Sequence, residues 1–220
     1  MKRSEVNRRQ SEALVLFGHL GLALPPWATW RPEEWKRAGD SALEIKKRML
    51  GWDVTDFGKG EFPRLGVILF TFRNGPADGS REPYCEKALV LRNGQALPAH
   101  FHWNKTEDII NRGGGELVIR MWNSAEDGSP TGEDVRVMVD GGLWTCCGAG
   151  AALRLSPGRS VTLTPRVYHD FRAEGGDVLI GEVSSVNDDN TDNRFLEPLQ
   201  RFASIEEDEE VLYCLCNEYP

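Results

Sequence analysis

The spacing of apolar residues divides the chain into a helical part and a β part. Near the amino terminus, Val6, Phe17 and other apolar residues lie close to a 3.6-residue stripe, which predicts an amphipathic helix over residues 4–21. Pro32 is a favourable first-turn residue and predicts a short helix over residues 32–39. Ser41 and Glu44 have the spacing of a capping box, which predicts a third helix over residues 41–50.

From about residue 52 short apolar or β-branched runs alternate with Gly, Asn, Asp and Pro. These runs predict strands at residues 65–72, 87–91, 96–102, 116–122, 135–139, 143–146, 151–155, 160–164, 168–172 and 178–186. So many short strands at this spacing favour a sandwich or barrel. We therefore expect a mainly β domain over residues 51–220, with a helical extension over residues 1–50 packed on it.

The last 35 or so residues are polar and less regular. They predict a polar loop at 187–193, a short helix at 194–201, a solvated acidic turn at 206–210 and a final strand at 211–215.

Composition narrows the classes of partner. The chain has 220 residues, with 26 Lys and Arg against 34 Asp and Glu, so its net charge is −8. An acidic chain argues against a nucleic-acid or anionic-membrane partner, and no apolar run is long enough to span a bilayer. Residues 13–24 resemble a signal sequence, but no cleavage site follows them. The five cysteines are odd in number and form no C-x-x-C motif, which favours reduced thiols in a cytoplasmic protein.

The histidines supply the first candidate chemistry. His100 and His102 are two apart in a predicted strand, so both imidazoles point to the same face. Glu107 follows after a short bend and lies within reach of the same point. A third imidazole can come from His169, in a segment that barrel closure would bring opposite the first. Imidazoles and one carboxylate form a ligand set for a divalent metal ion.

The spacing of these residues resembles the first cupin motif. Gly94, His100, His102, Glu107 and Gly114 stand at the offsets of that motif. The resemblance implies a cupin double-stranded β-helix barrel (a jelly roll).

The second cupin motif is matched less closely. Gly158, Pro165 and His169 resemble it, but Val167 stands where the usual glycine would be, and the histidine arrives one residue early. With this match the resemblance implies that His169 joins His100, His102 and Glu107 as the metal ligands.

A more specific resemblance covers residues 5 to 219. Four segments are similar to the D-lyxose isomerase family of cupins: residues 50–58 (LGWDVTDFG), 69–75 (LFTFRNG), 100–108 (HFHWNKTED) and 181–195 (GEVSSVNDDNTDNRF). This resemblance implies interconversion of D-lyxose and D-xylulose, and of D-mannose and D-fructose, as free monosaccharides. It implies Mn²⁺ as the cofactor, with Zn, Co, Ni or Fe as alternatives, and a homodimer.

Isomerisation of an aldose needs a group that moves a proton between C1 and C2, besides a metal that polarises the carbonyl. Glu182 is the first candidate for this carboxylate, because it shares a strand face with an apolar residue expected inside the barrel. Asp188 and Glu197 are the other candidates. Lys105 is a candidate to stabilise the enediolate or bind a hydroxyl, and Arg194 to hold the base or the substrate.

Each of these residues also has a structural interpretation, which stays open at this point. Lys105 can be a solvated turn lysine, residues 188–193 an Asx-rich structural loop, and Arg194 and Glu197 a surface pair on a helix. Two other functions remain open as well: a metal-dependent dioxygenase or oxalate-type cupin, and a non-catalytic sugar-binding cupin.

Overall fold

The computed structural model describes residues 1–76 and 80–220, and its helices precede the first strand. They are α1 (Arg3–His19), a 3₁₀ turn (Pro26–Thr29), α2 (Pro32–Ala38), a second 3₁₀ turn (Gly39–Ala42) and α3 (Leu43–Lys47). The first two predicted helices are confirmed. The predicted capping box is wrong, because the Ser41 hydroxyl donates to the Ala38 carbonyl and α3 begins only at Leu43.

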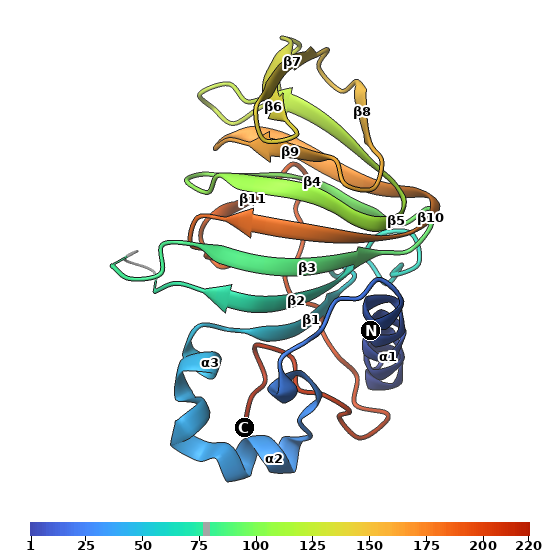
Figure 1. Cartoon of the computed structure of the whole chain (residues 1–220), viewed down its shortest axis with the longest axis vertical. Coiled ribbons are helices and arrows are strands. Elements are labelled where there is room, and N and C mark those ends of the chain that lie inside the picture. Colours follow the sequence, from blue (N-terminus) through green and yellow to red (C-terminus); the bar gives the residue numbers. More distant parts are fainter. Residues whose placement is uncertain (77–79) are drawn as a thin grey trace.

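The strands form one highly curved antiparallel sheet (Figure 1). They are β1 (Gly51–Thr55), β2 (Val67–Asn74), β3 (Cys85–Leu91), β4 (Ala96–His102), β5 (Glu107–Asn123), β6 (Val135–Val139), β7 (Leu143–Cys147), β8 (Ala152–Leu155), β9 (Ser160–Leu163), β10 (Val167–Ser184) and β11 (Asn193–Phe195). The main path is β1-β2-β3-β10-β5-β9-β6-β7, β4 pairs with β10 and β11, and β8 pairs with β5. The predicted mainly β, cupin-type fold is confirmed.

Two long strands, β5 and β10, run through the middle of the sheet. The predicted strands at 168–172 and 178–186 are parts of the single strand β10, which ends at Ser184, and residues 116–122 lie in the second half of β5. The register of the pair shifts between Glu174 and Val178, so the break expected between the two predicted strands is an irregularity within one continuous strand. Gly114 on the facing strand has φ +96°, and a Cβ there would lie 1.9 Å from the Asp177 carbonyl oxygen. Glycine is therefore required where the two strands pass each other.

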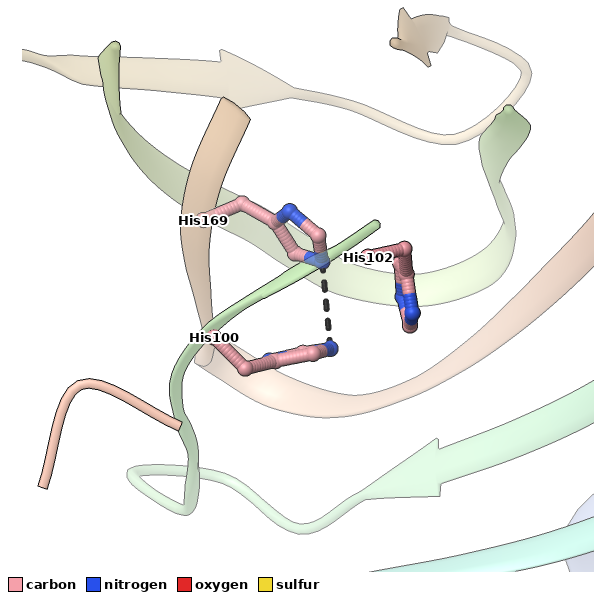
Figure 2. Close-up of side chains that lie close together, drawn as sticks. All are labelled: His100, His102 and His169. Atoms are coloured by element: carbon pink, nitrogen blue, oxygen red, sulfur yellow. Dashed lines mark hydrogen bonds between the residues drawn. The ribbon is translucent and has the colours of Figure 1, made fainter. Parts of the chain in front are cut away.

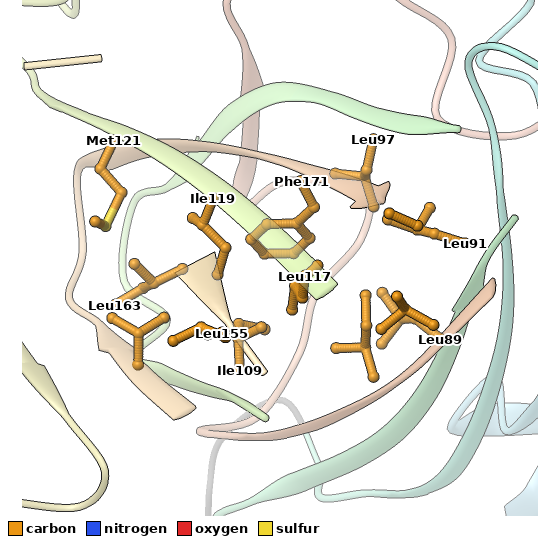
Figure 3. Packing of buried hydrophobic residues seen from close by; sticks show 14 of the residues in the cluster. Leu89, Leu91, Leu97, Ile109, Leu117, Ile119, Met121, Leu155, Leu163 and Phe171 are labelled. Atoms are coloured by element: carbon orange, nitrogen blue, oxygen red, sulfur yellow. The ribbon is translucent and has the colours of Figure 1, made fainter. Parts of the chain in front are cut away.

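Apolar clusters hold the barrel and its extension together. Inward-facing residues of the central strands fill the barrel, among them Leu89, Ile119 and Phe171 (Figure 3). A second cluster joins the outer face of β1 and β2 to α1, where the Phe17 and Trp52 rings stack with centroids 6.1 Å apart. The N-terminal helices thus pack on the sheet. The ring of Trp27 stacks on that of Phe70 in β2, with the ring centroids 5.3 Å apart. The domain boundary at residue 50 stays a prediction.

The carboxyl-terminal segment departs from the sequence-based expectations. The predicted helix over residues 194–201 is wrong, because residues 193–195 extend along β4 as β11, with Phe195 opposite His100. The predicted strand over residues 211–215 is wrong as well, since this segment makes only an isolated bridge between Leu215 and Trp52. By pairing as β11, the segment satisfies backbone groups at the edge of β4. These groups would stay unpaired if the segment formed a surface helix instead.

The acidic run at residues 206–210 is exposed, as predicted, but it is bound to the start of α1. Asp208 accepts hydrogen bonds from the Ser4 backbone amide (2.9 Å) and hydroxyl (2.8 Å), and Glu209 accepts one from Asn7 (2.8 Å). Carboxylates at a helix amino terminus satisfy free N–H groups and interact favourably with the helix dipole. The run therefore caps α1 from the other end of the chain.

Arg3 anchors the same contact and gives a test of it. Its side chain is 2% exposed and binds Glu207 and Glu218, both at 2.7 Å. Replacing Arg3 by alanine is expected to lower the free energy of unfolding by about 2 kcal/mol, because hydrogen bonds to charged groups are lost. Urea unfolding would measure this. Arg8→Ala is the control, since Arg8 is exposed and lies 3.8 Å from Glu5; equal losses in the two variants would contradict the anchoring role.

The cysteines and the helices bear on two further sequence-based expectations. All five cysteines are free thiols, and Cys85, Cys214 and Cys216 are buried. Within the residues that the structure describes, no helix is both long and apolar enough to cross a membrane.

Candidate active site

Three histidines from two strands converge inside the barrel (Figure 2). His100 and His102 lie on β4, and His169 lies on β10 directly opposite His100 in the strand register. One nitrogen from each ring lies within 4.8 Å of the others, and all three residues are buried. The alternation of side chains along β4 and the pairing of β4 with β10 together produce this cluster.

Glu107, the first residue of β5, joins the cluster. Its Oε1 lies 3.1 Å from His169 Nε2 and 3.5 Å from His102 Nε2. His100 Nε2 is 3.2 Å from His169 Nε2. Ligand atoms at about 2.0–2.2 Å from a metal ion stand roughly 3.0–3.5 Å from one another, so these separations fit one divalent ion.

The protonation of the histidines suits metal binding. Nδ1 of His100 lies 2.9 Å from the Pro98 carbonyl oxygen, and Nδ1 of His169 lies 3.0 Å from the Val167 carbonyl oxygen. Donation from Nδ1–H to these carbonyls leaves Nε2 free as a ligand. Burial lowers the pKa of His100 well below its usual value, and the neighbouring His169 and His102 lower it further. The ring is therefore neutral.

Unpartnered buried atoms support the same interpretation. Both ring nitrogens of His102 and Oε1 of Glu107 are buried without a hydrogen-bond partner among the described residues. Such atoms normally have partners in folded proteins. A metal ion would engage His102 Nε2 and Glu107 Oε1, so the cluster can hold such an ion.

A cavity opens beside this cluster. One part of its wall is apolar and comes from the barrel core and β11. The other part is polar and carries charges of both signs. The polar lining residues are His100, His102, Lys105, Glu107, Lys87, Glu182, Asp189, Asn193 and Arg201. This combination of an apolar wall and convergent polar groups is typical of a small-molecule site.

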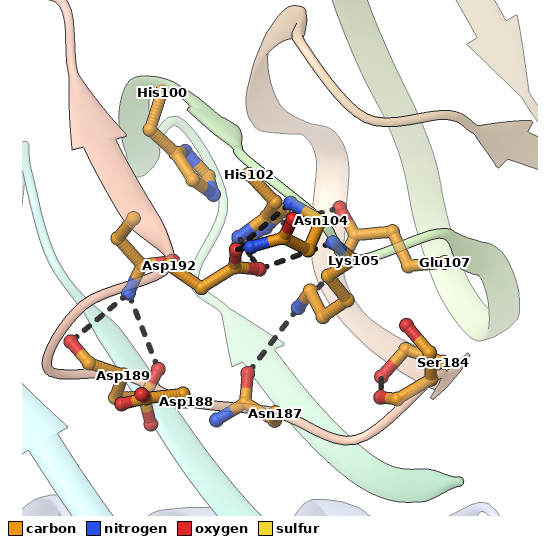
Figure 4. Close-up of polar contacts among 12 residues, drawn as sticks. His100, His102, Asn104, Lys105, Glu107, Ser184, Asn187, Asp188, Asp189 and Asp192 are labelled. Carbon is orange, nitrogen blue, oxygen red and sulfur yellow. Dashed lines mark hydrogen bonds and ion pairs between the residues drawn. The ribbon is translucent and has the colours of Figure 1, made fainter. Parts of the chain in front are cut away.

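Lys105 lies in the turn between β4 and β5 and reaches into the cavity (Figure 4). Its Nζ is 2.8 Å from Oε2 of Glu107 and 2.8 Å from Oε1 of Glu182. Burial by itself would lower the pKa of Lys105, but Glu107 and Glu182 raise it above its usual value. The residue is thus a buried ammonium group rather than a solvated turn lysine.

Glu182 on β10 points into the barrel together with Ile180, as the strand alternation predicts, and is 4% exposed. Its Oε1 accepts hydrogen bonds from Lys105 (2.8 Å) and from the Ser184 hydroxyl (3.2 Å). Burial acts to raise the pKa of Glu182, but Lys105 and Lys87 hold it below its usual value. It is therefore ionised and can accept a proton.

The other three candidates lie elsewhere. The lining of the cavity, within the part of the chain that the structure describes, does not include Asp188, Arg194 or Glu197. Asp188 accepts hydrogen bonds from the backbone of Asn190 (2.9 Å) and Thr191 (3.2 Å) and so closes its own loop. The guanidinium of Arg194 donates to the Asp127 carbonyl, and Glu197 is exposed. The structure does not bring these three together with the histidines.

Several polar residues of the site were missed from the sequence. Lys87 shares a strand face with Leu89 and Leu91, and this alternation could have indicated a buried lysine. Its Nζ donates to Asn187 (2.8 Å) and lies 3.6 Å from Glu182. The position of Asp189 and Arg201 in the cavity wall has no comparable local signal, because both lie outside regular elements.

Asp192 has a supporting role at the turn between the ligands. Its carboxylate accepts hydrogen bonds from the backbone amides of Asn104 (2.8 Å) and Lys105 (3.1 Å) (Figure 4). The polar loop after β10 thereby holds the segment that presents His102 and Lys105.

Comparison with known proteins agrees with this geometry. The sequence model of a family described as D-lyxose isomerase matches residues 1–219. This chain belongs to the D-lyxose isomerase family. It is 46% identical to the D-lyxose/D-mannose isomerases of Escherichia coli O157:H7 and of Serratia proteamaculans. In each case the match covers 100% of this chain and 98% of the relative.

Solved structures extend the likeness of the fold beyond this family. The L-ribose isomerase of Cellulomonas parahominis superposes with a TM-score of 0.62 at 19% identity, over 94% of this chain and 98% of that one. The L-ribose isomerase of Acinetobacter sp. DL28 gives a TM-score of 0.61 at 19% identity, over 93% and 98% of the two chains. At this identity the likeness shows a shared fold.

Proposed function

We propose that this member of the D-lyxose isomerase family is a metal-dependent aldose–ketose isomerase. It interconverts D-lyxose and D-xylulose, and D-mannose and D-fructose. The observation that supports this most directly is the buried pair of Lys105 and Glu182, 2.8 Å apart, which lines one cavity together with His100, His102 and Glu107. With His169, these last three residues form what we call the metal-type cluster. The family relationship and the names of the two relatives support the choice of sugars.

His100, His102, Glu107 and His169 would hold the metal ion. When bound, such an ion acts as a Lewis acid that polarises the sugar carbonyl and stabilises negative charge on its oxygens. Mn²⁺ is the ion we propose, and Zn, Co, Ni or Fe also suit imidazole and carboxylate ligands.

Glu182 is the proposed proton carrier. Its carboxylate removes the proton from C2 of the aldose and returns it to C1, by way of a cis-enediol. The hydroxyl proton passes from O2 to O1 in the same conversion, so the atoms balance and no oxidant is needed. The ammonium of Lys105, 2.8 Å from Glu182, donates hydrogen bonds toward the oxygen on which charge develops.

The charges of the cavity favour an uncharged sugar. Each cation in the wall already has a carboxylate partner: Lys105 has Glu182, Lys87 has Glu182 and Asp189, and Arg201 has Asp189. A sugar phosphate would have to displace one of these pairs in a buried site, which is costly.

A sugar assay without oxygen tests the proposal. Metal-loaded protein incubated anaerobically with D-lyxose or D-mannose is expected to produce D-xylulose or D-fructose. In D₂O the ketose is expected to carry deuterium at C1, because the proton passes through an exchangeable carboxylate. Activity that requires oxygen would instead indicate a dioxygenase, and sugar binding without turnover would indicate a binding cupin. Light scattering would test the homodimer that we propose as the assembly.

A further inference from the structure

Asp53 is a buried carboxylate for which the proposed chemistry has no use. It lies in the middle of β1 and is 4% exposed. Within the part of the chain that the structure describes, Asp53 does not line the cavity. Its Oδ2 nevertheless accepts a hydrogen bond from Nη1 of Arg201, 2.5 Å away. Burying a charged group costs free energy unless it is paired, so Asp53 depends on Arg201 for its place in the fold.

Arg201 connects Asp53 to the cavity. Its Nη2 donates to Oδ2 of Asp189 at 3.0 Å, and both residues line the cavity. Oδ1 of Asp189 lies 3.9 Å from Nζ of Lys87, which in turn is 3.6 Å from Glu182. Charges of alternating sign thus lead from β1 to the proposed proton carrier.

The two ends of the Arg201 guanidinium bind carboxylates from different kinds of element, a strand and a loop. Asp53 lies in a strand that pairs along its length with β2, where it stands opposite Leu69. Asp189 lies in the loop that follows β10, outside regular structure. The planar guanidinium presents donors in fixed directions, so an anchor on one side determines where the other carboxylate is held.

We propose that Asp53 is a positioning residue for sugar recognition. Acting through Arg201, it holds Asp189, and with it Lys87, where they hydrogen-bond the sugar hydroxyls remote from the reacting carbons. This inference rests on the proposed function. The effect belongs to substrate binding rather than to the proton transfer, because Asp53 touches neither the metal-type cluster nor Glu182.

Asp53→Asn tests the role with little change in shape. The amide cannot pair with the guanidinium as the carboxylate does, so KM for D-lyxose is expected to rise about 10-fold, with kcat changed less than about threefold. Metal content measured by mass spectrometry is expected to be unchanged. Calorimetry is expected to show the same loss in D-lyxose affinity. A KM and a Kd equal to those of the wild type would overturn the inference.

A double-mutant cycle separates positioning from a general loss of stability. If Asp53 acts through Arg201 on Asp189, adding Asp53→Asn to Asp189→Asn is expected to change KM by less than about twofold. If the increases in KM caused by the two single substitutions multiply in the double variant, the inference is overturned. If Asp53→Asn does not fold, Arg201→Lys replaces the planar fork by a point charge and is expected to raise KM in the same way. An unchanged KM in that variant would also overturn it.

Glu174→Gln is the matched control, since it breaks an exposed ion pair with Arg154 away from the cavity and is expected to leave KM and kcat unchanged. The isomerase function and the positioning role of Asp53 are contradicted by different results. Wild-type protein that binds D-lyxose without turnover contradicts the isomerase function, and Kd still tests Asp53. Turnover by the wild type with an unaffected Asp53→Asn variant contradicts only the positioning role, and wild-type protein that neither binds nor converts the sugar contradicts both.

Discussion

Glu182→Gln is expected to lower kcat for D-lyxose about 10³-fold, within the range of losses seen when a general base is removed. Glutamine keeps the shape of the side chain and can still accept a hydrogen bond from Lys105, but it cannot take up a proton. KM is expected to change little, because the lost interaction belongs to the proton-transfer step. Initial rates of ketose formation, with metal content and thermal unfolding as checks, would measure this.

The same substitution at Glu197 separates the carboxylates that the sequence left as alternatives. Glu197 is exposed and lies outside the cavity, so Glu197→Gln is expected to keep wild-type kcat. The opposite result, with Glu197→Gln inactive and Glu182→Gln active, would assign the proton transfer to an exposed residue outside the cavity lining. The proposed role of Glu182 would then be abandoned.

His169→Gln is expected to remove most of the bound metal and to reduce kcat/KM by about 10³-fold, because the polarising ion supplies several kcal/mol of transition-state stabilisation. Glutamine leaves His100, His102 and Glu107 in place but removes the ligand nitrogen opposite His100. Metal content per chain and the rate of ketose formation would measure the two effects. Added Mn²⁺ is expected to raise the melting temperature of metal-depleted wild-type protein, and to raise that of the variant far less.

His19 provides the matched control, since it is the fourth histidine of the chain and is exposed at the end of α1. His19→Gln is expected to retain metal, activity and the stabilisation by Mn²⁺. A His169→Gln variant that binds one metal ion per chain as tightly as the wild type would be incompatible with the four-residue ligand set.

The predicted metal-type cluster and the location of Glu182 depended on local patterns that are strong in this chain. Residues two apart in a strand share a face whatever the rest of the fold does, so His100 and His102 could be placed together from their spacing. The same rule placed Glu182 beside Ile180 inside the barrel. Lys87 obeys the same rule, and its burial beside Leu89 and Leu91 is a consequence of strand alternation that the sequence-based prediction did not include.

The misplaced elements share a different cause. The segment over residues 194–201 has helix-like composition, but β4 has an open edge that its first residues pair with as β11. The acidic run at residues 206–210 looks like any solvated turn, and its hydrogen bonds with α1 cross about 200 residues of chain. Tertiary contacts of this kind outweigh weak local preferences.

The sequence by itself determined the class of fold, the family and the three histidines with their carboxylate, because strand alternation and motif spacing are local properties. Only the tertiary structure decided which polar residues of the segment after β10 reach the cavity. It brought Asp189 and Arg201 to the wall and left Asp188, Arg194 and Glu197 outside. Those positions depend on the path of the segment after β10, most of which is irregular. Strand edges and buried charges determine that path, and they belong to residues far away in the chain.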